Sequence, residues 1–233
     1  MLSVIICAFI YVSIFWKVSM NRQLSPVDQW ISAFDVALRS LCVPPLRQAA
    51  RPNPAEGMVE PTLNAKEQKQ VAGLMRVNHA GEVCAQALYQ GQALTAQLTT
   101  VRDQMTVAAL EEIDHLAWCE ERLRELNSVP GLLNPLWYAG SFIIGLFAGW
   151  VGDQWSLGFV AETERQVTAH LKNHIARLPA QDGKTRAILL QMQVDETMHA
   201  ETAQRAGAKD LPGFIKYGMR LVSKLMTKTT YYL

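Results

Sequence analysis

Cysteine and charge are both scarce in this chain of 233 residues. The four cysteines, Cys7, Cys42, Cys84 and Cys119, form no Cys-x-x-Cys pair, which argues against a disulfide framework and against a cysteine zinc site. Charged residues make up only 18% of the chain. Because the net charge is +1, no strong field attracts polyanions, and we expect no nucleic-acid partner.

Strand-length runs of alternating β-branched residues are also missing, which predicts an all-α fold. Five of the ten prolines lie between Pro44 and Pro61, and this stretch is expected to be an arm rather than a helix. Helical periodicity and Pro/Gly stop signals predict helices in the following segments: Glu67–Thr99, Arg102–Leu126, Pro135–Val151, Leu157–Leu178, Lys184–Arg205 and a last one after Pro212.

Histidine is rare as well, yet two of the five histidines close a Glu-x-x-His motif. The pairs are Glu112 with His115 and Glu196 with His199, and both lie on largely apolar helix faces. A buried carboxylate costs several kcal/mol unless a positive charge compensates it. The motifs therefore indicate that metal ions bind between the helices.

Two inward-facing Glu-x-x-His pairs require one further glutamate from each of two other helices in a carboxylate-bridged two-metal centre. Glu164 lies on an apolar stripe, whereas Glu162 lies about 200° away around the axis and is expected to be solvated. On the first predicted helix Glu82 is the candidate, on a mixed face. Glu82 precedes Glu112 by 30 residues and Glu164 precedes Glu196 by 32, a pseudo-repeat that supports both choices. A carboxylate-rich donor set favours iron.

Two acidic residues next to the motifs are candidates for supporting roles. Glu111 and Asp195 each directly precede a motif glutamate, about 100° around the helix. Each is placed to accept the free ring N–H of the histidine on the opposite helix. For Glu111, a plain solvated position is the alternative.

Four runs of the sequence resemble those of a known family. They are LMRVNHAGEVCAQALYQGQALTA (74–96), EEIDHLAWCEERL (111–123), SLGFVAETERQVTAHL (156–171) and VDETMHAETA (194–203). They are similar to the motifs of the demethoxyubiquinone hydroxylases of coenzyme Q biosynthesis, which are ferritin-like di-iron proteins. The resemblance starts near residue 24, and the apolar segment before Met20 departs from it. It implies six iron ligands, the set that helical phase favours: Glu82, Glu112, His115, Glu164, Glu196 and His199.

This resemblance implies an enzyme, a di-iron monooxygenase with two iron ions per chain, which uses O2 and an external electron donor. The expected reaction is hydroxylation of 2-polyprenyl-3-methyl-6-methoxy-1,4-benzoquinol to the 3-demethylubiquinol, and other ubiquinone-pathway enzymes are expected partners. Two alternatives remain. One is a ferritin-like iron-binding or redox protein without hydroxylase turnover, and the other is a membrane scaffold with incidental Glu-x-x-His pairs.

Hydrophobicity is concentrated in residues 126–161, where Asp153 is the only charged residue. This aromatic-rich stretch fits a helix lying in the membrane interface, which we favour, a buried crossover helix or a true span. Lys216, Arg220, Lys224 and Lys228 recur every fourth residue beside an apolar flank. That pattern is typical of a helix on anionic lipid or of a bundle helix with a solvated basic face. Polyprenyl quinol and lipid are thus the expected partners, at the cytoplasmic face of a bacterial cell membrane.

The chain is predicted to have three parts. Residues 1–19 are an apolar extension, either an anchor or a mis-assigned start, and residues 20–65 hold an N-terminal helix and the proline-rich arm. Residues 66–233 form the ferritin-like di-iron hydroxylase domain. The expected fold is an all-α, ferritin-like four-helix bundle with two additional membrane-associated helices.

Overall fold

The computed structural model describes residues 25–41 and 47–233. These ranges contain helices and no strand, which confirms the all-α prediction. The apolar extension predicted for residues 1–19 lies outside the described residues. The helices are α2 (Pro26–Leu41), α3 (Ala65–Thr95), α4 (Thr99–Glu125), α5 (Asn134–Val151), α6 (Asp153–Arg177), α7 (Gly183–Arg205) and α8 (Gly213–Tyr232).

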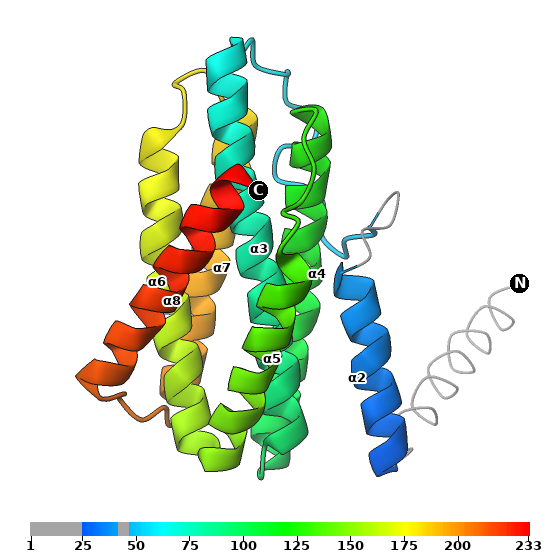
Figure 1. Ribbon diagram of the computed structural model, residues 1–233, viewed down its shortest axis with the longest axis vertical. Helices are drawn as coiled ribbons and strands as arrows, with labels where there is room; N and C mark the ends of the chain where they lie inside the picture. The colour runs from blue at the N-terminus through cyan, green and yellow to red at the C-terminus, as the bar shows by residue number, and fades with distance from the viewer. Residues whose placement is uncertain (1–24, 42–46) are drawn as a thin grey trace, which may run out of the picture. The chain divides into compact units, whose positions relative to one another are not determined.

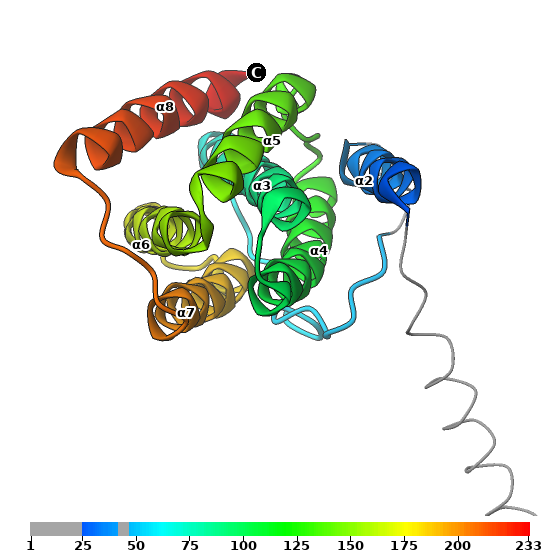
Figure 2. The same cartoon turned by 90° about the horizontal axis from the view of Figure 1, so that it is seen from below.

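Four of these helices form a bundle, which Figure 2 shows almost end-on. The helices α3 and α4 pair as one hairpin and α6 and α7 as the other (Figure 1). The helix α5 packs along α3, and α8 lies over the same side of the bundle, against α3 and α6. Residues Val36–Leu233 are one compact unit, and the described residues 25–35 belong to another.

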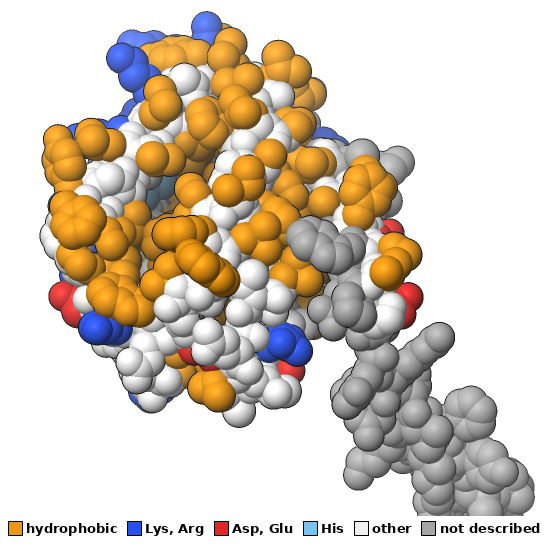
Figure 3. Space-filling model, turned by 60° about the horizontal axis from the view of Figure 1, so that its bottom comes forward, with side chains coloured by type: hydrophobic (Ala, Val, Ile, Leu, Met, Phe, Trp, Pro, Cys, Tyr) orange, Lys and Arg blue, Asp and Glu red, His pale blue; other side chains and the backbone are white. Residues whose placement is uncertain are grey.

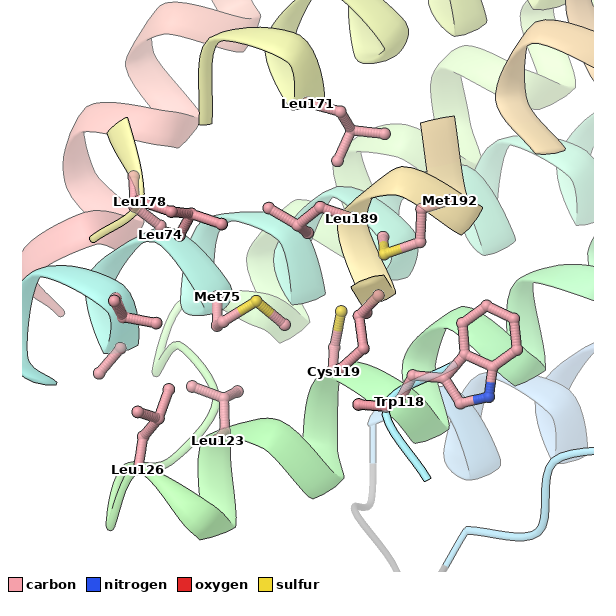
Figure 4. Packing of buried hydrophobic residues seen from close by; sticks show 14 residues of the cluster. Leu74, Met75, Trp118, Cys119, Leu123, Leu126, Leu171, Leu178, Leu189 and Met192 are labelled. Atoms are coloured by element: carbon pink, nitrogen blue, oxygen red, sulfur yellow. The ribbon is translucent and has the colours of Figure 1, made fainter. Parts of the chain in front are cut away.

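Two apolar clusters of the bundle interior lie on either side of a polar layer, and a third packs α5 against α3 and α4. One cluster joins α3, α4, α6 and α7 near the turn that links α6 to α7, and Figure 4 shows Leu74, Trp118, Leu171 and Met192 as members from the four helices. The other cluster lies toward the opposite end of the bundle and includes Tyr89. Along each bundle helix the predicted ligands, one each on α3 and α6 and two each on α4 and α7, fall between these clusters, so apolar packing closes the site at both ends.

The C-terminal end of α3 differs from the sequence prediction. The helix α3 stops at Thr95 and not at Thr99. The reason is a tertiary contact, because the Asp153 carboxylate accepts the backbone N–H groups of Gln97 at 3.0 Å and Leu98 at 2.7 Å. The lone charge of the apolar stretch therefore satisfies backbone donors that a longer helix would have used.

The helix α6 also starts earlier than predicted, at Asp153 rather than Leu157. The residue before it, Gly152, has a φ of +129°, a conformation that L side chains rarely adopt. The glycine allows the chain to turn from α5 into α6 within a single residue.

The contact between α3 and α5 brings two backbones close together. A Cβ atom on Gly91 would lie 2.5 Å from the carbonyl oxygen of Phe142, and one on Gly145 would overlap the backbone of Leu88. The opposite face of α5 exposes large hydrophobic side chains, including Phe147. The apolar stretch is thus packed on one face and open on the other.

Within the described ranges, none of the helices combines the length and the hydrophobicity needed to cross a membrane.

The arm, defined as residues 47–64, docks on α4. Arg47 donates to Glu120 at 2.8 Å, and Asn53 donates to Glu121 at 2.6 Å. Further along, Glu60 accepts from the fully buried Arg122 at 2.8 Å. Ion pairs and hydrogen bonds therefore hold the arm against the bundle although it is not helical.

Candidate metal centre

The predicted ligands all lie in the polar layer at the middle of the bundle. Each bundle helix contributes at least one, as helical phase predicted, and α4 and α7 each contribute a Glu-x-x-His pair. Five of the six are buried, and the side chain of His199 is 9% exposed. The structure thus brings together residues that are up to 117 positions apart in sequence: Glu82, Glu112, His115, Glu164, Glu196 and His199.

His115 faces three carboxylates from three different helices. Its Nδ1 atom lies 3.1 Å from Glu112 Oε2, 3.2 Å from Glu196 Oε1 and 3.5 Å from Glu82 Oε2. Ligand atoms of these four residues lie within 4.8 Å of one another. A single metal ion can therefore be held by His115 and its carboxylate neighbours.

His199 faces the other oxygens of two of the same carboxylates. Its Nδ1 atom lies 3.3 Å from Glu196 Oε2 and 3.5 Å from Glu112 Oε1. Glu112 and Glu196 each direct one oxygen toward each histidine, which is the arrangement of carboxylates that bridge two metal ions. On this side Glu164 completes the layer, and its Oε1 accepts a hydrogen bond from the Tyr89 hydroxyl at 2.6 Å.

Both histidines also contact a carboxylate outside the ligand layer. Asp195 Oδ2 lies 2.9 Å from His115 Nε2, and Glu111 Oε2 lies 2.5 Å from His199 Nε2. These are the two contacts expected from the sequence. A proton on each Nε2 leaves the Nδ1 lone pair facing the ligand layer, which is the tautomer that binds a metal. The Glu111 side chain is also 46% exposed, so it is both solvated and bonded to the histidine.

The charges of the layer are unbalanced without a cation. Burial and the nearby carboxylates raise the pKa of Glu82 and of Glu164 well above the usual range. Burial opposes a charged His115, yet hydrogen bonds to Asp195 and to the ligand carboxylates raise its pKa well above the usual value. Protons and cations compete for such a layer, since either one neutralises the carboxylates.

Three carboxylate oxygens in the layer carry the clearest sign of a missing partner. Glu112 Oε1, Glu164 Oε2 and Glu196 Oε1 are buried, and none accepts a well-aligned hydrogen bond in the described parts of the chain, although Glu196 Oε1 lies 3.2 Å from His115 Nδ1. Buried polar atoms are normally satisfied. Four carboxylates with two neutral imidazoles balance two divalent cations, so the residues present fit a pair of metal ions, and the oxygen-rich set suits iron.

The predicted choice between Glu162 and Glu164 can be compared with the structure. Glu164 faces the ligand layer and Glu162 points away from it, as helical phase required. The predicted solvation of Glu162 is wrong, because the residue is only 7% exposed. It accepts from Gln166 at 2.7 Å, and Lys216 Nζ of α8 lies 3.8 Å away. The docking of α8 buries it, and helical phase carries no information about that.

Sequence analysis missed two residues that contact the site. Tyr89 follows Glu82 by seven positions, two helical turns on the same face, and that spacing was a usable signal. Arg51 contacts Asp195 from 144 positions away. No periodic signal marks Arg51, because it lies in the non-helical arm.

The fold and the site together define a class of protein. A glutamate from each of two helices and a Glu-x-x-His pair from each of the other two are characteristic of ferritin-like carboxylate bundles. A dodecameric thioferritin from Bacteroides fragilis, a bacterioferritin-related protein, has a similar fold, with a TM-score of 0.50 and 18% identity over 59% of this chain and 84% of that chain. This likeness supports the ferritin-like fold.

Sequence comparison then gives the family. The family model described as ubiquinone biosynthesis protein COQ7 matches residues 69–230. A "3-demethoxyubiquinol 3-hydroxylase" of Legionella pneumophila (strain Paris) is 61% identical over 212 residues, which are 91% of this chain and 100% of the relative. One of Acinetobacter baumannii (strain SDF) is 59% identical with the same coverage. The chain belongs to the COQ7 family, and the resemblance seen in its motifs is confirmed.

Proposed function

We propose that this chain is a di-iron monooxygenase that hydroxylates a demethoxyubiquinol with O2. The observation that carries the proposal is the pair Glu112 and Glu196, each with one oxygen toward His115 and one toward His199. The names of the close relatives support the reaction. The burial of five of the six residues of the polar layer supports a centre that is largely shielded from water.

The site residues divide into three roles. Glu82 and His115 would hold one iron ion and Glu164 and His199 would hold the other, with Glu112 and Glu196 placed between these two pairs of residues. Bound iron supplies the activation of O2, with electrons from an external donor, so that one oxygen atom enters the quinol ring and the other leaves as water.

The other polar residues keep the ligands in place. Asp195 and Glu111 accept the Nε2 protons and so direct both Nδ1 atoms inward. Tyr89 donates to Glu164 and fixes the orientation of that carboxylate, while its ring lies edge-on to the His199 ring at 6.3 Å. The apolar clusters on either side exclude water from the reacting ring.

A narrow crevice between α3 and α6 is the proposed route of the quinol ring to the centre. It has no room for a water molecule as it stands, so its side chains must move apart to admit the ring. Leu88 and Tyr89 line it from α3, and Val160 and Glu164 line it from α6. Leu88 also meets α5 at Gly145, so the crevice lies on the side of the bundle that α5 and α8 cover (Figure 2). A ring entering here reaches Glu164 first.

The same side of the bundle exposes a hydrophobic face, and Figure 3 shows hydrophobic side chains gathered over it with lysine and arginine at its margins. Exposed hydrophobic areas of this kind mark interaction surfaces. The basic residues of α8 suit anionic lipid. Peripheral attachment at the cytoplasmic face of the bacterial cell membrane lets the polyprenyl tail stay in lipid while the ring enters the crevice. The face consists of Leu136, Ile143, Phe147, Trp150, Phe214, Tyr217, Leu221, Val222 and Leu225.

Hydroxylation creates a new phenol on the quinol ring. An O-methylating enzyme of the ubiquinone pathway must consume this product, and it is the pathway partner that we expect for the chain.

Two measurements test the proposal against its alternatives. Metal analysis of the purified chain is expected to give about two iron ions per chain, and a metal-free protein would support a scaffold role. The iron-loaded chain is then given the methoxy quinol, a reductant and ¹⁸O2. Label in a hydroxylated product supports the hydroxylase, and iron oxidation without product supports the ferritin-like alternative.

Attachment to lipid has a separate test. The chain is expected to float with anionic vesicles and to stay in solution with vesicles that carry no net charge. A variant with Phe147→Ser and Trp150→Ser keeps the metal ligands and removes part of the hydrophobic face. Unchanged flotation of this variant would contradict the proposed face.

A further inference from the structure

Arg51 of the arm reaches the back of the His115 site. Its Nη1 atom donates to Asp195 Oδ2 at 2.9 Å, and the same oxygen lies 2.9 Å from His115 Nε2. Its Nε atom donates to Asp114 Oδ2 at 2.7 Å. One guanidinium therefore links a carboxylate of α4 to a carboxylate of α7, next to a metal-ligating ring.

The Asp195 carboxylate is held from every side. Gln191 donates to Oδ1 at 2.9 Å, while Arg51 and His115 share Oδ2. The Asp195 side chain is only 2% exposed, so solvent has little access to the carboxylate although the Arg51 side chain is 37% exposed. Charge-assisted bonds of this geometry fix the orientation of the carboxylate and, through it, the ring.

An aromatic contact adds to the same arrangement. The Arg51 guanidinium lies 5.0 Å from the centre of the Trp118 ring, which lies 5.3 Å from the His115 ring. The backbone N–H of Ala50 also donates to Asp114 at 2.6 Å. Rotation of the His115 ring away from the ligand layer would break its hydrogen bond to the Asp195 oxygen that Arg51 also holds.

The His199 side has no such support. In the described parts of the chain, the Glu111 carboxylate bonds to His199 alone, and its side chain is 46% exposed against 2% for Asp195. Water competes for an exposed carboxylate and weakens its hold on the ring. The two histidines have equivalent positions in the sequence motif and unequal support in the structure.

We infer that Arg51 is a positioning residue for His115, and that it makes the His115 half of the centre bind metal more tightly than the His199 half. The inference rests on the proposed metal centre. A ligand that is already fixed loses less conformational freedom when the ion binds. The first ion therefore fills the His115 half, and the ion in the His199 half is the first to leave.

Cobalt(II) titration of the full-length, metal-stripped chain tests this, with equilibrium dialysis for stoichiometry and the visible absorption of the bound ion for its environment. The wild type is expected to show two binding phases that differ about 10- to 100-fold in affinity. His199→Gln is expected to keep the tight phase and lose the weak one. Arg51→Gln is expected to weaken the tight phase by about 10-fold or more.

Arg47→Gln is the matched control. Arg47 is also an arginine of the arm paired with a carboxylate of α4, at 2.8 Å from Glu120, and it does not contact Asp195. We expect it to leave both phases in place. Arg51→Lys restores the charge without the planar fork that bonds Asp114 and Asp195 together, and partial recovery of the tight phase is expected.

The outcomes separate the inference from the proposed function. Two outcomes overturn the inference and leave the proposed function unaffected. One is a single binding phase in which both ions bind with equal affinity, and the other is an equal loss of cobalt affinity in Arg51→Gln and Arg47→Gln. Two unequal phases that respond to Arg51→Gln uphold the inference even if no quinol is hydroxylated. A chain that binds no cobalt and no iron overturns both.

Discussion

The two helical hairpins of the bundle carry the same ligand pattern in different surroundings. On α3 and α4, the outer faces are covered by α5 and by the arm, and His115 is fully buried. The outer face of α7 is open and exposes Leu190, Val194 and Met198. The repeat in the sequence sets which residues form the candidate metal layer, whereas the covering elements set how firmly each half is held.

The largest effect is expected where a candidate ligand of the second hairpin, α6–α7, is removed. Glu164→Ala should lower hydroxylation more than about 100-fold, since a ligand loss exceeds the usual effect of losing a supporting residue. Glu162→Ala, two positions away, should stay within a few-fold of wild type. Product formation and iron content check both variants. Equal losses would mean that helical phase does not select the ligand.

Replacing the carboxylate that supports His115 should lower iron retention more than replacing the one that supports His199. Asp195→Asn is expected to lower iron retention against a chelator about 10- to 100-fold, because no water molecule can replace the buried carboxylate as the acceptor of the His115 Nε2 proton. Glu111→Gln should cost less, because solvent already competes for that contact. The comparison between the hairpins fails if Glu111→Gln has the larger effect.

The packing of α5 on α3 can be changed by a substitution that leaves every candidate ligand in place. Gly145→Val places a side chain against the backbone of Leu88 and is expected to lower the free energy of unfolding by about 1–3 kcal/mol. A Cβ atom on Gly140 would have no neighbouring atom within 4 Å. Gly140→Ala is therefore the control and should not destabilise the chain. Urea unfolding measures both, and equal stabilities would show that α5 does not need close contact with α3.

The smallest effect is the pH dependence of the metal-stripped chain. Burial opposes charge on His199, but its carboxylate neighbours raise its pKa from 6.5 to about 10. A raised pKa stabilises the folded chain fully below pH 6.5, and this contribution is lost as the pH rises toward 10. Raised pKa values at Glu82 and Glu164 act in the same direction.

The melting temperature of the stripped chain should therefore fall between pH 6.5 and 10, by about 2–4 °C per kcal/mol lost. His199→Gln should flatten part of this fall. Metal should remove most of it, because the ion takes the place of the protons. A stripped chain that grows more stable over this range would contradict the raised pKa.

Much of the site followed from local geometry. The helical repeat fixes which side chains share a face, so the six candidate ligands and the exclusion of Glu162 from the layer could be deduced from spacing. Asp195 and Glu111 each directly precede a motif glutamate, about 100° around the helix axis. This position predicted their contacts with the histidines of the opposite helices. These inferences hold because neighbouring residues on a helix keep a constant angular relation.

By itself, then, the sequence determined an all-α chain with a candidate ligand set of four glutamates and two histidines. Only the tertiary structure decided that Asp153 ends α3, that α8 buries Glu162 and that Arg51 stands behind His115. Each of these contacts joins segments more than 50 positions apart. Periodicity relates residues only within one helix. Packing between distant segments decides that the surroundings of His115 are covered while those of His199 are partly exposed to solvent.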